Sequence, residues 1–244
     1  MKIFFLLPAY NEAENILSLL EKILSLEKSL PSKYTLSIII IDDGSSDDTA
    51  TCVKNFHNLT SLQLIRHKHN MGLGGALRTG LKTISSIIQP NDVAVTMDAD
   101  NTHDPFLIIP MIKKVEEGAD VVIASRYQRG SQERGVPLLR ILMSRLGNTA
   151  FRILFCVPRV RDYSSGYRMI RGSTLIDLSR KTGGTFFKKE GFACMTELLL
   201  NLSSCTNCFS EVPLVLRYDY KKGPSKMIPG KTIMEYLSLI VSKK

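Results

Sequence analysis

Residues 3–24 read IFFLLPAYNEAENILSLLEKIL, and their hydrophobic period changes part-way along. The first six residues form an apolar run of strand length, which is typical of a strand buried in a parallel sheet. From Asn11 onward the apolar side chains recur at the spacing of one helix face, at Ile16, Leu19, Leu20, Ile23 and Leu24. A buried strand that leads straight into an amphipathic helix is the repeating unit of an α/β sheet.

The same alternation continues through residue 125. Apolar runs of strand length recur at residues 36–41, 62–66, 93–97 and 121–124, and helical patterns occupy residues 72–88 and 104–117. The segment at residues 46–48 carries the polar side chains that begin a further helix. This pattern predicts an α/β fold, with a doubly wound, mostly parallel central sheet flanked by helices.

The alternation ends after Ser125. Residues 126–135 are polar and contain glycine, so we expect a loop there, followed by an apolar helix at 136–155. A strand near 165–170, helices from 173 and around 195–202, a strand at 212–218 and a final helix at 231–241 complete the pattern. Because no linker or repeat interrupts the chain, we expect a single domain over residues 1–244, with halves 1–125 and 126–244.

The charge is divided unevenly between these halves. Residues 1–125 carry 11 basic and 15 acidic side chains, whereas residues 126–244 carry 21 basic and 8 acidic ones. The basic half suggests an anionic partner, which is a nucleic acid, a phosphorylated substrate or a membrane surface. No segment approaches the ~18–20 apolar residues of a membrane span. The apolar start has no cleavage site, and five scattered cysteines form no disulfide framework, so we expect a reducing, cytoplasmic location.

Carboxylates gather where the predicted strands end. Asp42 and Asp43 follow the second strand, and Asp98 and Asp100 follow the fourth. Ligands of open parallel sheets bind beyond the carboxyl ends of the strands, and a hard cation such as Mg²⁺ uses one or two carboxylates together with substrate phosphates. Helix capping explains other acidic residues nearby, but it explains this cluster less well. The glycines at 72–75 match neither a dinucleotide fingerprint nor a P-loop, and we expect them to allow close approach of a ligand or a neighbouring strand.

Seven motifs, in order, resemble those of family 2 glycosyltransferases and, more narrowly, the dolichyl-phosphate mannosyltransferase-like branch. They are residues 8–12 (PAYNE), 42–45 (DDGS), 70–74 (NMGLG), 98–100 (DAD) with His103 and Pro105, 125–126 (SR), 162–168 (DYSSGYR), and Arg217 with 223–226 (GPSK). The resemblance covers roughly residues 1–230. It implies the GT-A fold, a Rossmann-like sheet whose first strand ends hold a nucleotide and whose C-terminal region binds the acceptor.

The resemblance also implies roles for residues of the first half. The base and ribose would contact Pro8, Ala9, Tyr10, Glu12, Ile41 and Asp43. Asp98 and Ala99 would line the nucleotide-sugar, and Asp100 would bind Mg²⁺ or Mn²⁺ at the diphosphate. Relatives often carry a glutamine as second metal ligand where this chain has Thr102. For His103 we keep two interpretations, a metal ligand or a structural hydrogen bond.

The basic half fits an acceptor that is itself a phosphate. The implied reaction is inverting transfer of a sugar from a GDP- or UDP-sugar, with mannose from GDP-mannose favoured, to polyprenyl phosphate. A lipid phosphate is already ionised and needs no general base, but it needs cations, and by motif these are Arg126, Arg217 and Lys226. Cations also stabilise the charge that grows on the leaving diphosphate.

Two other functions are weighed against this one. A family 2 enzyme that acts on a sugar hydroxyl in polysaccharide synthesis needs a general base, for which Glu197 is the first candidate and Asp162 the second. A non-catalytic nucleotide-sugar-binding protein would be expected to have lost its metal-binding aspartate, and Asp100 is present.

The arginines of the second half suggest a membrane surface. Eight arginines, one glutamate and no lysine lie between residues 126 and 161, and Arg140 and Arg145 belong to the apolar helix at 136–155. We expect a peripheral contact with phospholipid headgroups and a polyprenyl tail, against the alternative of a solvated basic helix face. Nucleic acid is disfavoured because no nucleic-acid-binding motif accompanies the charge. The final helix is either a packed end or a surface anchor, and the oligomeric state is left open.

Overall fold

The computed structural model describes residues 1–59, 61–220 and 229–242. The strands are β1 (Lys2–Ala9), β2 (Thr35–Asp42), β3 (Leu62–Arg66), β4 (Val93–Thr96), β5 (Val121–Ser125), β6 (Gln132–Arg134), β7 (Arg168–Arg171), β8 (Phe209–Pro213) and β9 (Val215–Arg217). The α-helices are α1 (Ala13–Ser29), α2 (Thr49–Lys54), α3 (Gly72–Ser85), α4 (Ile108–Glu116), α5 (Leu138–Phe155), α6 (Gly172–Thr182), α7 (Ala193–Leu202) and α8 (Pro229–Ser242). Two 3₁₀ turns are η1 (Pro105–Leu107) and η2 (Tyr218–Tyr220).

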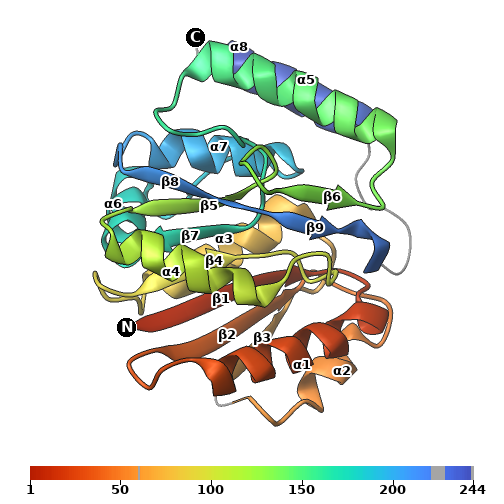
Figure 1. The fold of residues 1–244 in the computed structure, drawn as a ribbon. Coiled ribbons are helices and arrows are strands. Elements are labelled where there is room, and N and C mark those ends of the chain that lie inside the picture. Colours follow the sequence, from red (N-terminus) through yellow and green to blue (C-terminus); the bar gives the residue numbers. More distant parts are fainter. Residues whose placement is uncertain (60, 221–228, 243–244) are drawn as a thin grey trace.

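A seven-stranded sheet runs through both halves of the chain in the order β3-β2-β1-β4-β7-β5-β8 (Figure 1). Its pairings are parallel except those of β7, which is antiparallel to both β4 and β5. The expectation of a mostly parallel α/β sheet is confirmed. The antiparallel β7, from the second half of the chain, lies between β4 and β5 of the first half, so strands of both halves share one sheet.

Helices cover both faces of this sheet. Alternate residues of β1 point to opposite faces, so Ile3, Phe5 and Leu7 pack with α1 and α4, whereas Phe4 and Leu6 pack with α3, α6 and α7. These β1 side chains are fully buried. The uninterrupted apolar runs in the sequence therefore reflect strands that are covered on both sides.

The predicted strand at residues 212–218 is wrong as a single element, and so is the expectation that residues 126–135 are only a loop. The chain forms β8 up to Pro213 and then β9, which pairs in parallel with β6 as a separate small sheet. At the crossing, the Leu214 N–H donates to the Ser125 carbonyl at 2.9 Å, and the Leu214 carbonyl accepts from the Gln132 N–H at 3.0 Å. Pro213 does not interrupt the bonds to β5, because the N–H of the following Leu214 still reaches Ser125. The break comes where the Leu214 carbonyl accepts from Gln132 of β6 instead.

The helices α5 and α8 lie together at one end of the molecule, above the main sheet (Figure 1). They touch through Phe151 and Tyr236, whose ring centroids are 4.9 Å apart in an edge-to-face arrangement. The final helix is packed at Leu239, which is 1% exposed, while its Leu237 and Val241 side chains face solvent. Within the described residues, no helix combines the length and apolar character needed to cross a membrane.

Candidate active site

Three loops at the carboxyl ends of β1, β2 and β4 form one edge of the sheet. Each turns through a left-handed residue, which is Asn11 (φ +51°), Gly44 (φ +72°) and Asn101 (φ +61°) respectively. Asparagine and glycine adopt this conformation more readily than other residues. At Gly44 a Cβ atom would also lie 2.6 Å from the backbone carbon of His69, so only glycine fits there.

The first two loops are bonded to one another. The Asp43 N–H donates to the Ala9 carbonyl at 2.8 Å, and the Asn11 N–H donates to the Ser45 hydroxyl at 2.9 Å. The Glu12 N–H reaches across to the Thr49 hydroxyl at 2.8 Å. The residues with implied nucleotide contacts in these loops are thus brought together.

Their side chains differ in how accessible they are. Pro8 and Tyr10 are half-buried, while Ala9, Ile41 and Ala99 are buried. The Glu12 carboxylate is 6% exposed and accepts from the Asn15 amide at 2.6 Å. Contact of a ligand with the buried apolar members would therefore involve their backbone or their loop edges.

The two aspartates at the end of β2, Asp42 and Asp43, have different environments. Asp42 is fully buried, with its Oδ2 3.0 Å from the Arg66 Nε and its Oδ1 accepting from the Ser45 N–H at 2.9 Å. These contacts give Asp42 a structural role in the loop. The Asp43 carboxylate instead accepts from the His67 Nδ1–H at 2.7 Å and from the Met71 N–H at 2.9 Å, both on Oδ1.

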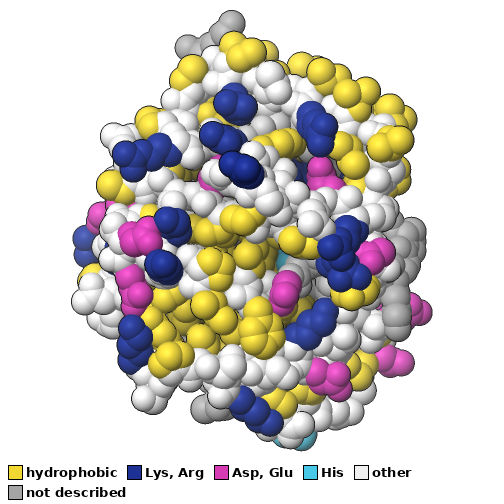
Figure 2. Space-filling view, in the orientation of Figure 1, with side chains coloured by type: hydrophobic (Ala, Val, Ile, Leu, Met, Phe, Trp, Pro, Cys, Tyr) yellow, Lys and Arg dark blue, Asp and Glu magenta, His cyan; other side chains and the backbone are white. Residues whose placement is uncertain are grey.

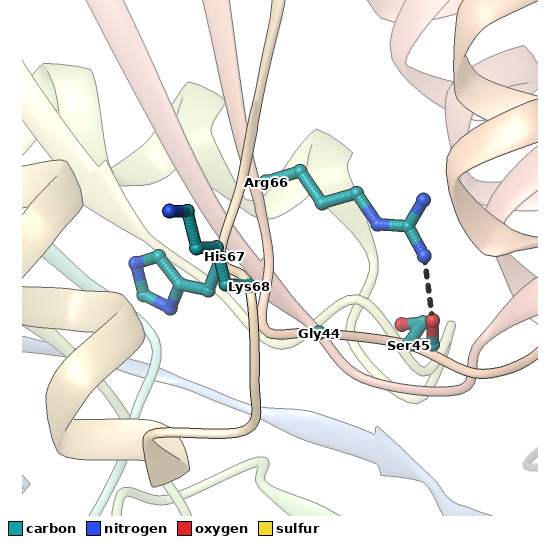
Figure 3. Close-up of a pocket in the computed structure, with 5 residues that line it drawn as sticks. All are labelled: Gly44, Ser45, Arg66, His67 and Lys68. Carbon is teal, nitrogen blue, oxygen red and sulfur yellow. Dashed lines mark hydrogen bonds between the residues drawn. The ribbon is translucent and has the colours of Figure 1, made fainter.

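A shallow pocket of about 380 Å³ opens beside this loop, lined by Gly44, Ser45, Arg66, His67 and Lys68 (Figure 3). Arg66 extends toward Ser45 and donates to its carbonyl at 2.8 Å, while the His67 ring points the other way. The pocket is next to Asp43 and carries three basic side chains, so it suits an anionic or acceptor-rich group.

The loop after β4 holds the second acidic pair. Asp100 is 8% exposed, and its Oδ1 accepts from the Thr102 hydroxyl at 2.7 Å and from the Thr102 N–H at 3.2 Å. Asp98 is half-buried and lies against Gly166, where a Cβ atom would be 3.4 Å from the Asp98 Oδ1. The His103 Nδ1 is buried and has no hydrogen-bond partner among the residues that the structure describes, and its ring packs against Tyr167 with the centroids 5.4 Å apart.

The side-chain oxygens of Asp98, Asp100 and Thr102 suit a hard divalent ion, although they do not make up a complete set of ligands. In the described part of the chain, no group of three or more His, Cys, Asp and Glu side chains lies close enough to hold a metal ion. Asp100 and the adjacent Thr102 hydroxyl offer two neighbouring oxygens, and the unsatisfied His103 nitrogen is on the same loop. Such a partial donor set fits Mg²⁺ or Mn²⁺ bound jointly with phosphate oxygens.

Arg126 is held by Asp162 in a two-pronged ion pair. The Arg126 Nε and Nη2 donate to the two Asp162 oxygens at 2.8 and 2.7 Å, and its remaining donors reach Ser144 at 3.2 Å and Ser164 at 2.7 Å. Burial lowers the pKa of Arg126, but the charge of Asp162 and the hydrogen bonds to it together outweigh burial and raise the pKa. Burial in turn raises the pKa of Asp162, but the charge of Arg126, the hydrogen bonds from Arg126 and the charge of Arg168 together lower it, so this carboxylate stays ionised.

A second arginine, Arg168, is fully buried close to the same aspartate. Its guanidinium donates to the Met195 and Tyr163 carbonyls at 2.5 and 2.8 Å. Burial lowers its pKa to about 10, while the charge of Asp162 acts in the opposite direction. Arg168 therefore ties Tyr163 to α7 in the interior, whereas the Arg126 side chain is 16% exposed.

Arg217, at the end of β9, meets the acidic loop of the first half. Its backbone N–H donates to the Thr102 carbonyl at 2.9 Å. Its guanidinium pairs with Asp219 at 2.8 Å and stacks on the Tyr220 ring, 3.8 Å from the centroid. Lys226, the third cation of the motif, lies outside the described residues.

Glu197 is not brought to this edge by any contact that the structure describes. It lies on α7 and is 8% exposed, and its Oε2 accepts from the Lys188 and Lys189 N–H groups, both at 2.9 Å. Those bonds hold the segment that packs on the glycine turn of α3, where the Gly74 N–H donates to the Glu190 carbonyl at 2.7 Å. A Cβ atom at Gly74 would lie 2.2 Å from the Lys189 oxygen, so the glycines allow approach of a neighbouring loop.

Two features of the site were not foreseen in the sequence. The contacts of His67 with Asp43 and with Thr79 connect three elements, and only the basic run at residues 66–68 hinted at a site there. Asp162 was weighed only as a general base, but its side chain is the counter-ion of Arg126.

Comparison with known proteins decides the family. Residues 5–178 match the sequence profile described as Glycosyl transferase family 2. The chain belongs to glycosyltransferase family 2. A dolichol-phosphate mannosyltransferase of Pyrococcus furiosus is 30% identical over 97% of this chain, which spans only 62% of that relative's length. A polyprenol monophosphomannose synthase of Mycolicibacterium smegmatis is 29% identical over 94% of this chain and 82% of its own.

A third relative carries a different sugar in its name. The UDP-N-acetylglucosamine–dolichyl-phosphate N-acetylglucosaminyltransferase of Methanococcus voltae is 28% identical over 99% of this family 2 chain and 97% of its own length. Among solved structures, glucosyl-3-phosphoglycerate synthase from Mycobacterium tuberculosis, in complex with Mn²⁺, UDP and phosphoglyceric acid, superposes with a TM-score of 0.64 at 20% identity. The superposition covers 96% of this chain and 74% of the synthase, and it confirms the GT-A fold.

Proposed function

We propose that this family 2 glycosyltransferase moves a sugar, with inversion, from a nucleotide-sugar to polyprenyl phosphate. One observation carries the proposal. The cationic segment of the second half joins the acidic loop of the first half through the bond from the Arg217 N–H to the Thr102 carbonyl. A reaction between two phosphate-bearing substrates needs both a metal-binding acidic loop and cations beside it.

The donor would lie along the ends of β1, β2 and β4. The base and ribose contact Pro8, Ala9, Tyr10, Glu12, Ile41 and Asp43, and the sugar nucleotide contacts Asp98 and Ala99. Asp100, with Thr102 beside it, would hold Mg²⁺ or Mn²⁺ against the diphosphate. When bound, the ion neutralises the charge that develops on the departing diphosphate.

The acceptor phosphate would be bound from the second half, by Arg126, Arg217 and Lys226. Arginine can bind phosphate through two parallel N–H groups. The Nε and Nη2 groups of Arg126 are engaged by Asp162, so Arg126 would contribute its charge and its Nη1 group. The phosphate oxygen is ionised at neutral pH, so these residues only bind it, orient it and offset its repulsion from the donor diphosphate.

The engaged state of the candidate bases disfavours a sugar hydroxyl as acceptor. Glu197 Oε2 accepts two backbone N–H groups, and Asp162 is paired with Arg126 with its pKa lowered. A general base that works at neutral pH needs a pKa near that range and access to the proton. Neither carboxylate meets both conditions, and a phosphate acceptor requires neither.

We propose GDP-mannose as the favoured donor, on the names of the relatives from Pyrococcus and Mycolicibacterium. The Methanococcus relative makes a UDP-sugar the alternative. The test is to incubate the purified chain with polyprenyl phosphate, Mg²⁺ or Mn²⁺, and labelled GDP-mannose, UDP-glucose or UDP-N-acetylglucosamine. Label in a lipid extract from one donor supports the proposal, and no lipid product from any donor contradicts it.

We further propose that α5 lies on a membrane surface as a peripheral anchor. Its exposed apolar side chains are Leu138, Leu139, Leu142, Met143, Leu146, Ile153 and Leu154. The helix contains three arginines and no acidic residue, and of these Arg145 and Arg152 are exposed whereas Arg140 contacts Tyr218 at 2.8 Å. Figure 2 shows hydrophobic and basic side chains along this end of the molecule. An apolar face bordered by arginines fits anionic headgroups.

A further inference from the structure

We infer that His67, supported by Thr79, is a positioning residue that fixes which oxygen of Asp43 is presented to the nucleotide. The inference rests on the proposed contact of Asp43 with the base or ribose of the donor. It extends that proposal to two residues that no sequence motif assigns.

The hydrogen bonds of the Asp43 side chain converge on one oxygen. Oδ1 is 2.7 Å from the His67 Nδ1 and accepts from the Met71 N–H at 2.9 Å. Within the described residues, no hydrogen bond of the Asp43 side chain ends on Oδ2. Two donors saturate one oxygen of the carboxylate and leave the other to accept from a ligand hydroxyl or N–H group.

The imidazole is itself held at both nitrogens. A carboxylate only accepts, so the His67 Nδ1 carries a proton, and Nε2 shares a second hydrogen bond with the Thr79 hydroxyl, 2.9 Å away. Thr79 belongs to α3, so the ring bridges the ends of β2 and β3 to that helix. The side chains of His67 and Asp43 are only 10% and 5% exposed, and this shields the bond from water.

The pocket beside Asp43 indicates the side from which a ligand approaches this carboxylate. His67 lines it together with Gly44 and Ser45, which follow Asp43 directly. Figure 3 shows the His67 ring pointing away from the Arg66 side chain, which is committed to Asp42 and Ser45. Arg66 and His67 therefore fix Asp42 and Asp43 separately. Asp42 is fully buried, whereas Asp43 keeps Oδ2 for a ligand among the contacts that the structure describes.

The test is the affinity for nucleotide, measured by calorimetry with GDP and with UDP in the presence of Mg²⁺. His67→Ala is expected to raise the Kd of the nucleotide that the wild type binds by about tenfold or more, since the lost bond involves a charged group. The kcat at saturating donor should stay within about twofold, as positioning of the bound base affects KM first. His67→Asn, whose amide N–H falls near the Nδ1 position, should recover most of the affinity.

Matched variants separate this role from a loss of folding. His69→Ala changes an exposed histidine of the same loop and should leave the Kd unchanged. In an Asp43→Asn background, His67→Ala should add less than about twofold, because both changes act through one carboxylate. If His67→Ala does not fold, His67→Gln, which keeps a group near Thr79 but not near Asp43, replaces it in each comparison.

Three results would overturn the inference. A Kd for His67→Ala within twofold of wild type removes the positioning role while the proposed function stands. A full additional loss in the Asp43→Asn background shows that His67 acts elsewhere. A wild-type chain that binds neither GDP nor UDP overturns the proposed function, and the inference with it.

Discussion

Asp100 is the residue on which the proposed donor site depends most. Its buried carboxylate is held by Thr102. In the proposed site, Asp100 is the carboxylate that binds the divalent ion, and that ion neutralises the diphosphate. We expect Asp100→Ala to reduce sugar transfer at least 100-fold and to abolish the Mn²⁺-dependent gain in nucleotide affinity. Asp177→Ala, on an exposed face of α6, is the control and should change neither. Full activity of Asp100→Ala without added metal would contradict the assignment.

Asp162 makes stability depend on pH in a defined direction. Folding lowers the pKa of Asp162, so its contribution to the free energy of unfolding is complete above the ordinary value of about 3.9 and declines as the pH falls below it. Urea unfolding between pH 2 and 7 should show this loss in the wild type, and Asp162→Asn should flatten it. An identical acid slope in the two proteins would refute the coupling.

The ion pair between Arg126 and Asp162 also makes removal of either side chain strongly lower the free energy of unfolding at neutral pH. The Asp162→Ala change leaves Arg126 buried without its counter-ion, and removing one member of a buried pair costs about 3–5 kcal/mol. Chemical denaturation at pH 7 measures it. Lys114→Ala, which breaks an exposed pair with Glu117, is expected to change the free energy of unfolding by less than about 0.5 kcal/mol.

The acidic residues at the strand ends can be predicted from the sequence, but their hydrogen-bond and ion-pair partners cannot. Asp43, Asp98 and Asp100 were predicted at one sheet edge because strand ends can be counted along the chain. Arg126 and Asp162 are 36 residues apart, and nothing local to either indicates that they pair. Glu197 resembled an acceptor-site acid, and only the folded chain reveals its bonds to the segment at residues 188–189. Tertiary contacts of this kind leave no periodic trace in a sequence.

At the scale of elements, two glycines in helices should respond oppositely to the same substitution. Gly74→Ala drives a Cβ into the Lys189 carbonyl at 2.2 Å, and we expect a loss of about 1–3 kcal/mol in the free energy of unfolding. Gly147→Ala in α5 meets nothing within 4 Å and should gain up to about 1 kcal/mol from the better helix propensity. Thermal and urea unfolding of both variants measure this, and equal effects would contradict the packing described for α3.

The exposed apolar side chains of α5 lead to a separate prediction about membrane binding. Leu142→Ser combined with Leu146→Ser removes two exposed apolar side chains, so vesicle binding should fall about tenfold or more while stability changes little. Co-sedimentation with vesicles containing anionic lipid measures the bound fraction. Leu17→Ser, at a similarly exposed position on α1, is the matched control. Unchanged binding of the double variant would rule out α5 as the anchor.

Elements with a strong period were predicted well, and those without one were not. The apolar runs that became β1 to β5 and the helical face of α1 lie where the pattern puts them. The hydrophobic pattern does not encode which strand edge is open. It therefore does not predict that β7 is antiparallel or that the chain passes from β8 to β9 at Leu214.

For the whole molecule, the uneven charge corresponds to a spatial arrangement. The acidic half ends its strands in the loops of Asp43 and Asp100, and the basic half sets Arg126 and Arg217 at the same end of a continuous sheet. Both substrates of the proposed reaction carry phosphate. The donor diphosphate would meet the acidic half through the divalent ion, and the acceptor phosphate would meet the arginines directly. The central claim is that the second substrate is a phosphate and not a hydroxyl.

One measurement tests that claim most directly. Transfer of labelled sugar is followed to polyprenyl phosphate and, in parallel, to the matching polyprenol, with the same donor, metal and detergent. The account predicts a lipid-linked product from the phosphate and at least 100-fold less from the alcohol, with the phosphate reaction lost in Arg217→Ala. Equal transfer to both acceptors, or transfer to the alcohol alone, would contradict it.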